Sequence, residues 1–199
     1  MRPILVGGLL AVGIAASSGD ALGQAAPAGG FGNQGQLALQ ADLQLHFEGY
    51  SYSDNGGSGT DFLIQPAADY FVIDHLSVGG AVPLHVASPD GGRTTITFGI
   101  EPRVGYDIPI VEKLSFWPDL FFSFETSSRN NNGGSDTAFG IGVFAPLLFH
   151  PIAHFFLGIG PNLSTEFSHT YSAPNGRSGE GPKLTQYGIM STIGGWLAL

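Results

Sequence analysis

Cysteine is absent from the sequence, and this absence excludes several kinds of chemistry. The 199 residues offer no disulfide, no thiolate nucleophile and no sulfur ligand for a metal. They also lack the cysteine that carries a bacterial N-terminal lipid anchor. Disulfide-stapled folds, cysteine enzymes and cysteine-based metal proteins are therefore excluded.

Charged residues are scarce as well, and basic residues are the scarcest. They make up 12% of the chain, where about 25% is usual for a soluble domain. Only 7 residues are Lys or Arg against 16 Asp or Glu, which gives a net charge of −9. Binding to phosphates requires Lys and Arg, so no nucleic acid partner is expected. So few charges would also cover the surface of a soluble domain poorly.

Long apolar runs are missing after the N-terminal region, which argues against a transmembrane helix there. The first residues differ: Met1-Arg2-Pro3 is a short positive start, and residues 4–16 are apolar. The small residues Ala21-Leu22-Gly23 then resemble a cleavage site. We interpret residues 1–23 as a secretory signal peptide, with Ala25 as the alternative cleavage position. Residues 24–35, rich in Gly, Ala and Pro, are predicted to be a flexible segment.

A hydrophobic period of two residues dominates the rest of the chain. Over residues 36–52, apolar and polar side chains alternate strictly, which predicts a strand with two different faces. Such a strand exceeds the ~5–6 residues usual in globular proteins and satisfies the ~9–11 needed to cross a membrane. Seven further segments repeat the pattern, namely residues 62–72, 76–86, 96–108, 114–124, 139–149, 155–163 and 187–199. Eight strands are therefore predicted.

The connections between these segments alternate in length. Three are short, at residues 74–75, 109–113 and 150–152. Four are longer and rich in Asn, Gly, Ser and Asp, at residues 53–60, 88–93, 127–136 and 168–182. Short turns at one end and long loops at the other are typical of transmembrane barrels. One proline in each of predicted strands two to seven indicates local bulges, because proline removes a ladder donor.

The polar face decides between a membrane barrel and a soluble, lipocalin-like barrel. It carries Gln, Ser, Thr, Gly and scattered carboxylates with almost no Lys, which suits an enclosed interior better than a water-facing exterior. The interior of an eight-stranded barrel is just wide enough for side chains, and the bulky apolar face would overfill it. We therefore expect the apolar face to contact lipid, with the soluble barrel as the alternative.

With this pattern, the chain resembles the small eight-stranded outer-membrane β-barrels of the OmpA/OmpX type over residues 35–199. The hairpin pattern, the loop asymmetry and the segment Phe155-Phe156-Leu157-Gly158-Ile159-Gly160-Pro161-Asn162 carry the resemblance. It implies an all-β, closed, antiparallel, up-and-down eight-stranded transmembrane β-barrel at residues 36–199, in the outer membrane of a Gram-negative cell envelope. It also implies a monomer with outer-membrane lipid, lipopolysaccharide and the barrel-assembly machinery as partners.

Charged side chains on the polar face are predicted to form a network that plugs the interior, because enclosed charges need partners. Arg103 lies between Glu101 and Asp107 on one face of its strand. The predicted network is Asp42, Glu48, Asp69, Glu101, Arg103, Asp107, Asp119, Glu125 and Glu166. Aromatic side chains next to the short turns are expected at the membrane–water boundary, namely Tyr70, Tyr106 and Phe149.

We expect a non-enzymatic protein without cofactor or metal, acting in envelope structure or surface adhesion through its long loops. Two alternatives remain open at this point: a lipid A-modifying enzyme and a narrow solute channel. The enzyme would use serine and histidine near the rim, for which the candidates are Ser168, His169 and Ser172 beside Glu166, and the pair His85 and Ser88. The pair His150 and His154 spans a turn, so the two rings are expected to face different ways.

Overall fold

The computed structural model describes residues 30–43, 59–89, 94–129, 134–173 and 176–199. These residues form an antiparallel sheet and contain no helix. None of them, accordingly, belongs to a helix long and apolar enough to cross a membrane. The prediction of an all-β, antiparallel fold is confirmed.

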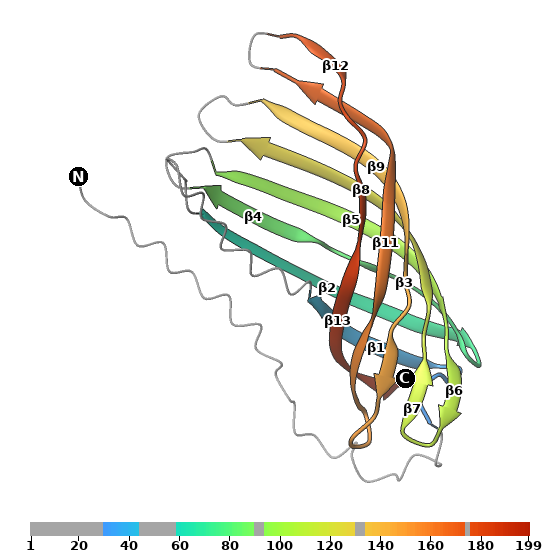
Figure 1. The fold of residues 1–199 in the computed structure, drawn as a ribbon. Helices are drawn as coiled ribbons and strands as arrows, with labels where there is room; N and C mark the ends of the chain where they lie inside the picture. The colour runs from blue at the N-terminus through green and yellow to red at the C-terminus, as the bar shows by residue number, and fades with distance from the viewer. Residues whose placement is uncertain (1–29, 44–58, 90–93, 130–133, 174–175) are drawn as a thin grey trace.

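Eight long strands pair in chain order, and the last one pairs with the first, so the sheet closes into a ring (Figure 1). Three of the eight are interrupted, and each of these three carries two labels: β3 and β4, β7 and β8, and β9 and β10. The ring consists of β1 (Gln36–Leu43), β2 (Gly59–Ile73), β3 and β4 (Leu76–Ala81, Leu84–Pro89), β5 (Thr95–Tyr106), β7 and β8 (Leu114–Phe116, Asp119–Arg129), β9 and β10 (Ser135–Phe144, Leu147–Phe149), β11 (Phe155–Ser172) and β13 (Thr185–Ala198). Two short strands, β6 (Ile108–Val111) and β12 (Ser178–Glu180), extend hairpins at opposite ends.

The strands are staggered around the ring, as closure requires. One row of directly paired residues starts at Leu37 on β1 and passes through Tyr70, Val78, Val104, Leu120, Val143 and Leu163 to Tyr187. On β13, Tyr187 lies beyond Ser191, whose partner on β1 is Leu43. After one turn of the ring the row is therefore displaced from its start at Leu37 by more than the length from Leu37 to Leu43, and the strands run obliquely around the ring.

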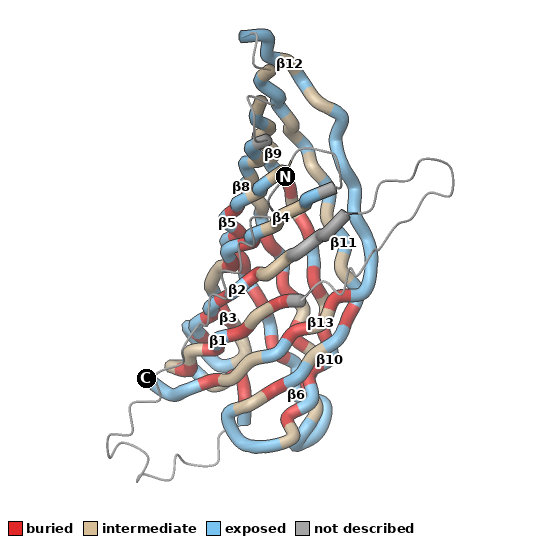
Figure 2. The backbone as a smooth tube through the Cα atoms, turned by 90° about the vertical axis from the view of Figure 1, so that its left-hand side faces the viewer, coloured by how far each residue is buried: buried red, intermediate tan, exposed pale blue. Residues whose placement is uncertain are grey.

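The two faces of the ring have opposite character. Along β5 the exposed side chains include Ile96, Phe98, Ile100 and Val104, whereas the intervening positions turn inward. The other strands follow the same alternation, and Figure 2 shows buried and exposed residues alternating along them. The described apolar positions of the predicted outward face do point outward. The predicted two-residue period is thus confirmed, with the polar face inside.

Prolines interrupt three members of the ring. Pro83 separates β3 from β4, Pro118 separates β7 from β8, and Pro146 separates β9 from β10. Pro66 and Pro161 lie inside continuous strands. Each of these five prolines still accepts a hydrogen bond from a neighbouring backbone N–H through its carbonyl, as in Val82 N to Pro66 O at 2.9 Å. The predicted local irregularities therefore occur at three of the prolines, whereas Pro66, Pro102 and Pro161 leave their strands continuous.

Three connections differ from the sequence prediction. The turn expected at 109–113 is shorter, because Ile108–Val111 continues as β6 and pairs with β7. The turn expected at 150–152 extends to His154, which has a φ of 63°. The loop expected at 168–182 instead contains the end of β11 and β12, which pair to form a projecting hairpin. In the first and third cases, backbone pairing extends the strands beyond the point where the apolar alternation stops.

Both described ends of the chain lie at the end of the ring that carries the short turns, here called the short-turn end. The backbone N–H of Leu199 donates to the carbonyl of Gly35 at 3.0 Å. The opposite end, which carries the β1–β2, β4–β5, β8–β9 and β11–β13 connections, is the long-connection end. Because the ring has an even number of antiparallel strands, its first strand begins and its last strand ends at the same end of the ring.

Candidate functional site: the interior of the ring

The interior at the short-turn end is filled by an aromatic plug around Phe31. The Phe31 ring is 7% exposed, and its centroid lies 5.0–5.3 Å from those of Phe71, Trp117, Phe156 and Trp196. Most of these contacts are edge-on or tilted, the geometry that aromatic quadrupoles favour. The plug, Phe31 with its four aromatic neighbours, is an apolar core inside a ring whose other inward residues are mainly polar.

The segment that carries Phe31 is held in place by backbone bonds. The side-chain oxygen of Gln36 accepts from the N–H groups of Gly32 and Asn33 at 2.9 and 3.2 Å. The His75 N–H donates to Gly32 O at 2.6 Å, and Gly35 N–H donates to Phe71 O at 2.9 Å. Residues 30–35, the end of the Gly-rich segment, are thus bonded to β1, to β2 and to the turn that follows β2.

Two polar side chains in and beside the plug each have a side-chain hydrogen-bond partner. The Trp117 indole N–H donates to Ser77 Oγ at 3.2 Å. His150, whose ring lies 5.3 Å from both Phe31 and Trp196, bonds Ser115 Oγ through Nε2 at 3.1 Å. Burial lowers the pKa of His150 below its ordinary value of 6.5. The imidazole is therefore kept neutral, as an apolar neighbourhood requires.

Above the plug, a buried ion cluster surrounds Arg103. Its guanidinium donates to Asp69 through Nε at 2.9 Å and through Nη2 at 2.5 Å, and to Asp42 through Nη1 at 2.9 Å. All three side chains are at most 4% exposed. The fork of the guanidinium matches a carboxylate in this two-point geometry. Asp42, Asp69 and Arg103 thus tie β1, β2 and β5 together across the interior.

Around this cluster, carboxylates outnumber the cation. Glu101 accepts from Gln65 Nε2 at 2.5 Å, and Asp119 is 6% exposed. Asp42 Oδ1 and Asp119 Oδ1 are buried without a hydrogen-bond partner in the part of the chain that the structure describes. Arg103 therefore balances only part of the negative charge that the ring encloses.

The pairing of Arg103 differs from what its own strand suggests. Glu101 and Asp107 lie on the same face of the chain as Arg103, but neither is its hydrogen-bond partner. Asp107 lies near His75, with 3.6 Å between His75 Nδ1 and Asp107 Oδ2. Glu101 bonds Gln65. The partners of Arg103 come from two other strands, and Gln65 did not figure among the predicted site residues. Cross-strand partners depend on register, which the alternation alone does not define.

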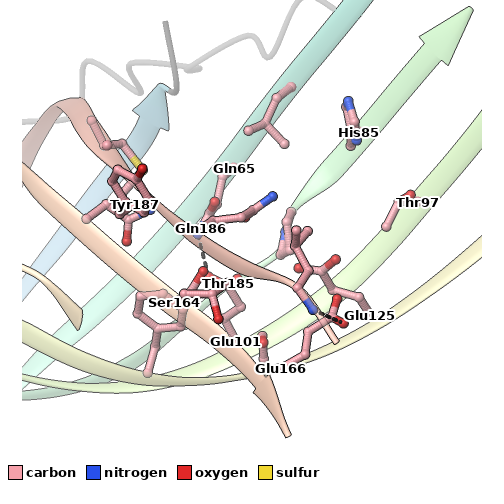
Figure 3. A pocket seen from close by; sticks show the side chains of 18 of the residues that line it. Gln65, His85, Thr97, Glu101, Glu125, Ser164, Glu166, Thr185, Gln186 and Tyr187 are labelled. Carbon is pink, nitrogen blue, oxygen red and sulfur yellow. Dashed lines mark hydrogen bonds between the residues drawn. The ribbon is translucent and has the colours of Figure 1, made fainter. Parts of the chain in front are cut away.

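The interior widens towards the long-connection end into a cavity of about 710 Å³ (Figure 3). Glu101, Glu125 and Glu166 line it from three different strands, and His85 lines it from β4. Leu63, Phe121 and Met190 give it an apolar part. Two members of the predicted network, Glu125 and Glu166, therefore lie at this cavity rather than beside Arg103. Glu48 lies outside the described residues.

A bulge in β11 arranges the rim beside this cavity. The register between β11 and β9 shifts between Glu166 and Ser168, which brings Glu166 and His169 into contact. His169 Nδ1 lies 3.1 Å from Glu166 Oε2, and its Nε2 lies 3.6 Å from Asp136 Oδ1. The same Glu166 oxygen accepts from the Leu184 N–H at 3.0 Å. This histidine is thus held between two acids.

The remaining candidate groups are dispersed. Ser88 Oγ lies 3.1 Å from Thr94 Oγ1, whereas His85 faces the cavity. His154 Nδ1 contacts the Trp196 carbonyl at 3.0 Å, so it does not share a ligand position with His150. Within the described ranges, no three His, Asp or Glu side chains are grouped closely enough to hold a metal ion.

Aromatic side chains occupy the outer face near both ends of the ring. Tyr70, Tyr106 and Phe149 are 40%, 50% and 48% exposed close to the short turns. Nearer the long connections, Phe139 packs between Phe124 and Phe167, at centroid distances of 5.0 and 6.5 Å. The boundary aromatics predicted above do not include this second group, although Phe167 follows the same two-residue alternation as the outward Leu163.

Comparison with known proteins gives no relative. No protein-family model matches the chain, and no curated protein sequence matches it either. The function is therefore argued from the geometry of the ring.

Proposed function

We propose that the chain is an integral outer-membrane β-barrel protein with a closed interior, similar in architecture to the OmpA/OmpX type. It acts in envelope structure or surface contact through the long connections, most of which lie at least partly outside the described residues. Residues 1–23 are its export signal under this proposal. Outer-membrane lipid and lipopolysaccharide surround it, and it reaches the membrane through the barrel-assembly machinery as a monomer.

The observation that carries this proposal is the inverted polarity of the ring. Large apolar side chains such as Ile100, Phe122 and Ile159 are 51–57% exposed on the outside, while Asp42, Asp69 and Arg103 are buried inside. A soluble domain would place these groups the other way round. In lipid, a closed ring of strands satisfies its backbone polar groups internally, which is the condition for sheet to cross a bilayer.

The filled interior supports a structural role over an open channel. The aromatic plug and the Arg103 cluster are stacked along the interior, below the cavity. A lipid A-modifying enzyme remains a second candidate because Glu166 and His169 form an acid–histidine pair at the rim. That candidate also needs a nucleophile within hydrogen-bond reach of the imidazole. The two ring nitrogens of His169 instead face the acids Glu166 and Asp136. We therefore favour the non-enzymatic role.

The experiment is a matched pair of charged substitutions. Leu120→Arg places a charge on the outer face, where 46% of the leucine is exposed. Ser123→Arg places the same charge inside, at the cavity. A charge facing lipid costs about 2–4 kcal/mol at the bilayer midplane. We expect Leu120→Arg to reduce the folded, heat-modifiable band in outer-membrane fractions strongly, and Ser123→Arg to leave it nearly unchanged.

The opposite outcome separates the alternatives. If the wild-type protein is freely soluble in the periplasm, or Leu120→Arg leaves the folded band in outer-membrane fractions unchanged, the membrane proposal fails. Steady conductance of the wild-type protein in planar bilayers would favour the channel. A change in lipid A mass that depends on His169 would favour the enzyme.

A further inference from the structure

We propose that the cavity at the long-connection end binds a small organic cation, an amine with an apolar chain. The cavity measures about 710 Å³, within the ~300–1,000 Å³ of small-molecule sites. At the short-turn end, by contrast, aromatic side chains fill the interior. The proposal goes beyond the envelope role and does not depend on it, because the cavity lies inside the ring.

The charge of the lining selects a cation. Glu101, Glu125 and Glu166 face the cavity, and no Lys or Arg is among its described lining residues. Beneath it lie the further carboxyl groups around Arg103. Acidic side chains that line one hollow attract cations into it. The other titratable groups at this hollow are His85 and Tyr187, and His169 contacts Glu166 at the rim.

The hydrogen-bonding capacity of the lining indicates a donor as ligand. Glu125 and Glu166 line the cavity with carboxylate oxygens, and Ser123, Ser127 and Ser164 line it with hydroxyl oxygens. These oxygens are acceptors, which is what an ammonium group with three donors and no acceptor requires. Figure 3 shows Glu101, Glu125 and Glu166 gathered at the same space.

The apolar part of the lining favours an organic cation over a metal ion. Phe121 and Met190 belong to a small buried cluster and border the cavity. They offer methylene groups a dry surface, and an aromatic ring attracts an alkylammonium group. The described side chains hold no group of three ligands suited to a metal ion.

The test uses the full chain folded in maltoside micelles, with spermidine as the cationic probe and triethylene glycol as a neutral probe of comparable length. We expect calorimetric titration to detect spermidine binding that weakens as salt rises. Glu125→Gln should weaken this binding about tenfold, the loss expected for one charge-assisted hydrogen bond. Glu112→Gln, which removes the same charge from the turn at the opposite end, should leave it unchanged.

A second variant keeps the charge constant. Phe121→Leu removes the aromatic ring that borders the cavity, and spermidine should again bind more weakly. Absence of spermidine binding, equal binding of triethylene glycol, or equal effects of Glu125→Gln and Glu112→Gln would each overturn the proposal. Heat-modifiable migration of the same samples shows whether each variant has folded. Membrane location is measured separately, so failure of one proposal does not imply failure of the other.

Discussion

The two ends of the ring's interior are built on opposite principles. At the short-turn end, four aromatic side chains pack around Phe31 and leave little room. At the long-connection end, polar and acidic side chains line an open cavity of about 710 Å³. Arg103 and its carboxylates form the boundary between them. The same alternating strands run through both regions, so the difference arises from which inward residues are large and apolar and which are small or charged.

The contrast indicates a division of roles along one interior. Aromatic packing closes and stabilises the end where the chain begins and ends. The polar end retains space and hydrogen-bonding side chains, which are features of recognition rather than of stability. Four predictions test this contrast, in order from the largest expected effect to the smallest. Each changes a residue of the aromatic plug, of the cavity or of the Arg103 cluster between them.

The boundary should produce the largest effect. Arg103→Met leaves Asp42 and Asp69 buried without their cation, and breaking a buried pair in this way costs about 3–5 kcal/mol. Denaturant unfolding of the protein in lipid vesicles measures the loss. Adding Asp42→Asn and Asp69→Asn should restore part of it. Lys113→Met, at an exposed turn, is the control and should change stability by less than about 0.5 kcal/mol. Equal midpoints for Arg103→Met and the wild type would show that the cluster does not contribute.

The aromatic plug should produce the next largest effect. Phe31→Ala removes the ring at its centre, and large-to-small changes at buried phenylalanine cost about 3–5 kcal/mol. The near-ultraviolet signal of Trp117 and Trp196 should change at the same time, because both rings contact Phe31.

Phe122→Ala is the matched control for the plug, since that ring is 52% exposed on the outer face. It should destabilise the protein less and leave the tryptophan signal unaltered. If the two variants behave alike, the N-terminal segment does not close this end of the ring.

Binding at the open end should change by a smaller amount. The tenfold weakening expected for spermidine with Glu125→Gln corresponds to about 1.4 kcal/mol. Global stability should hardly change in this variant, because Glu125 borders open space instead of packed side chains. A large loss of stability would mean that the cavity wall is part of the packed core.

The smallest effect concerns pH at the plug. Because burial lowers the pKa of His150, the folded state resists protonation, whereas the unfolded chain takes up a proton near pH 6.5. The contribution of this residue is therefore complete above pH 6.5 and declines as the pH falls below it. His150→Gln should flatten the difference in unfolding midpoint between pH 8 and pH 5. An unchanged pH dependence would assign it to other groups.

Much of the ring could be predicted because its signal is local. Alternation along residues 96–106, for example, defined both the strand and its outward face without reference to any neighbour. Asp42, Asp69 and Arg103 could be assigned to the interior for the same reason. The partners of Arg103 could not be predicted, since they depend on how β1, β2 and β5 align across the ring. Phe31 was missed because a lone aromatic among glycines carries no period.

The sequence by itself determined the period, the number of strands, the inward and outward faces, and which connections are long. These properties follow from side-chain polarity at neighbouring positions, and each strand carries them independently. Only the tertiary structure decided that Phe31 closes one end, that Arg103 bridges β1 and β2, and that the β11 bulge joins Glu166 to His169. The first two depend on register and stagger around a closed ring, where residues far apart in the chain meet, and the third depends on a bulge that the pairing of β11 with β9 produces.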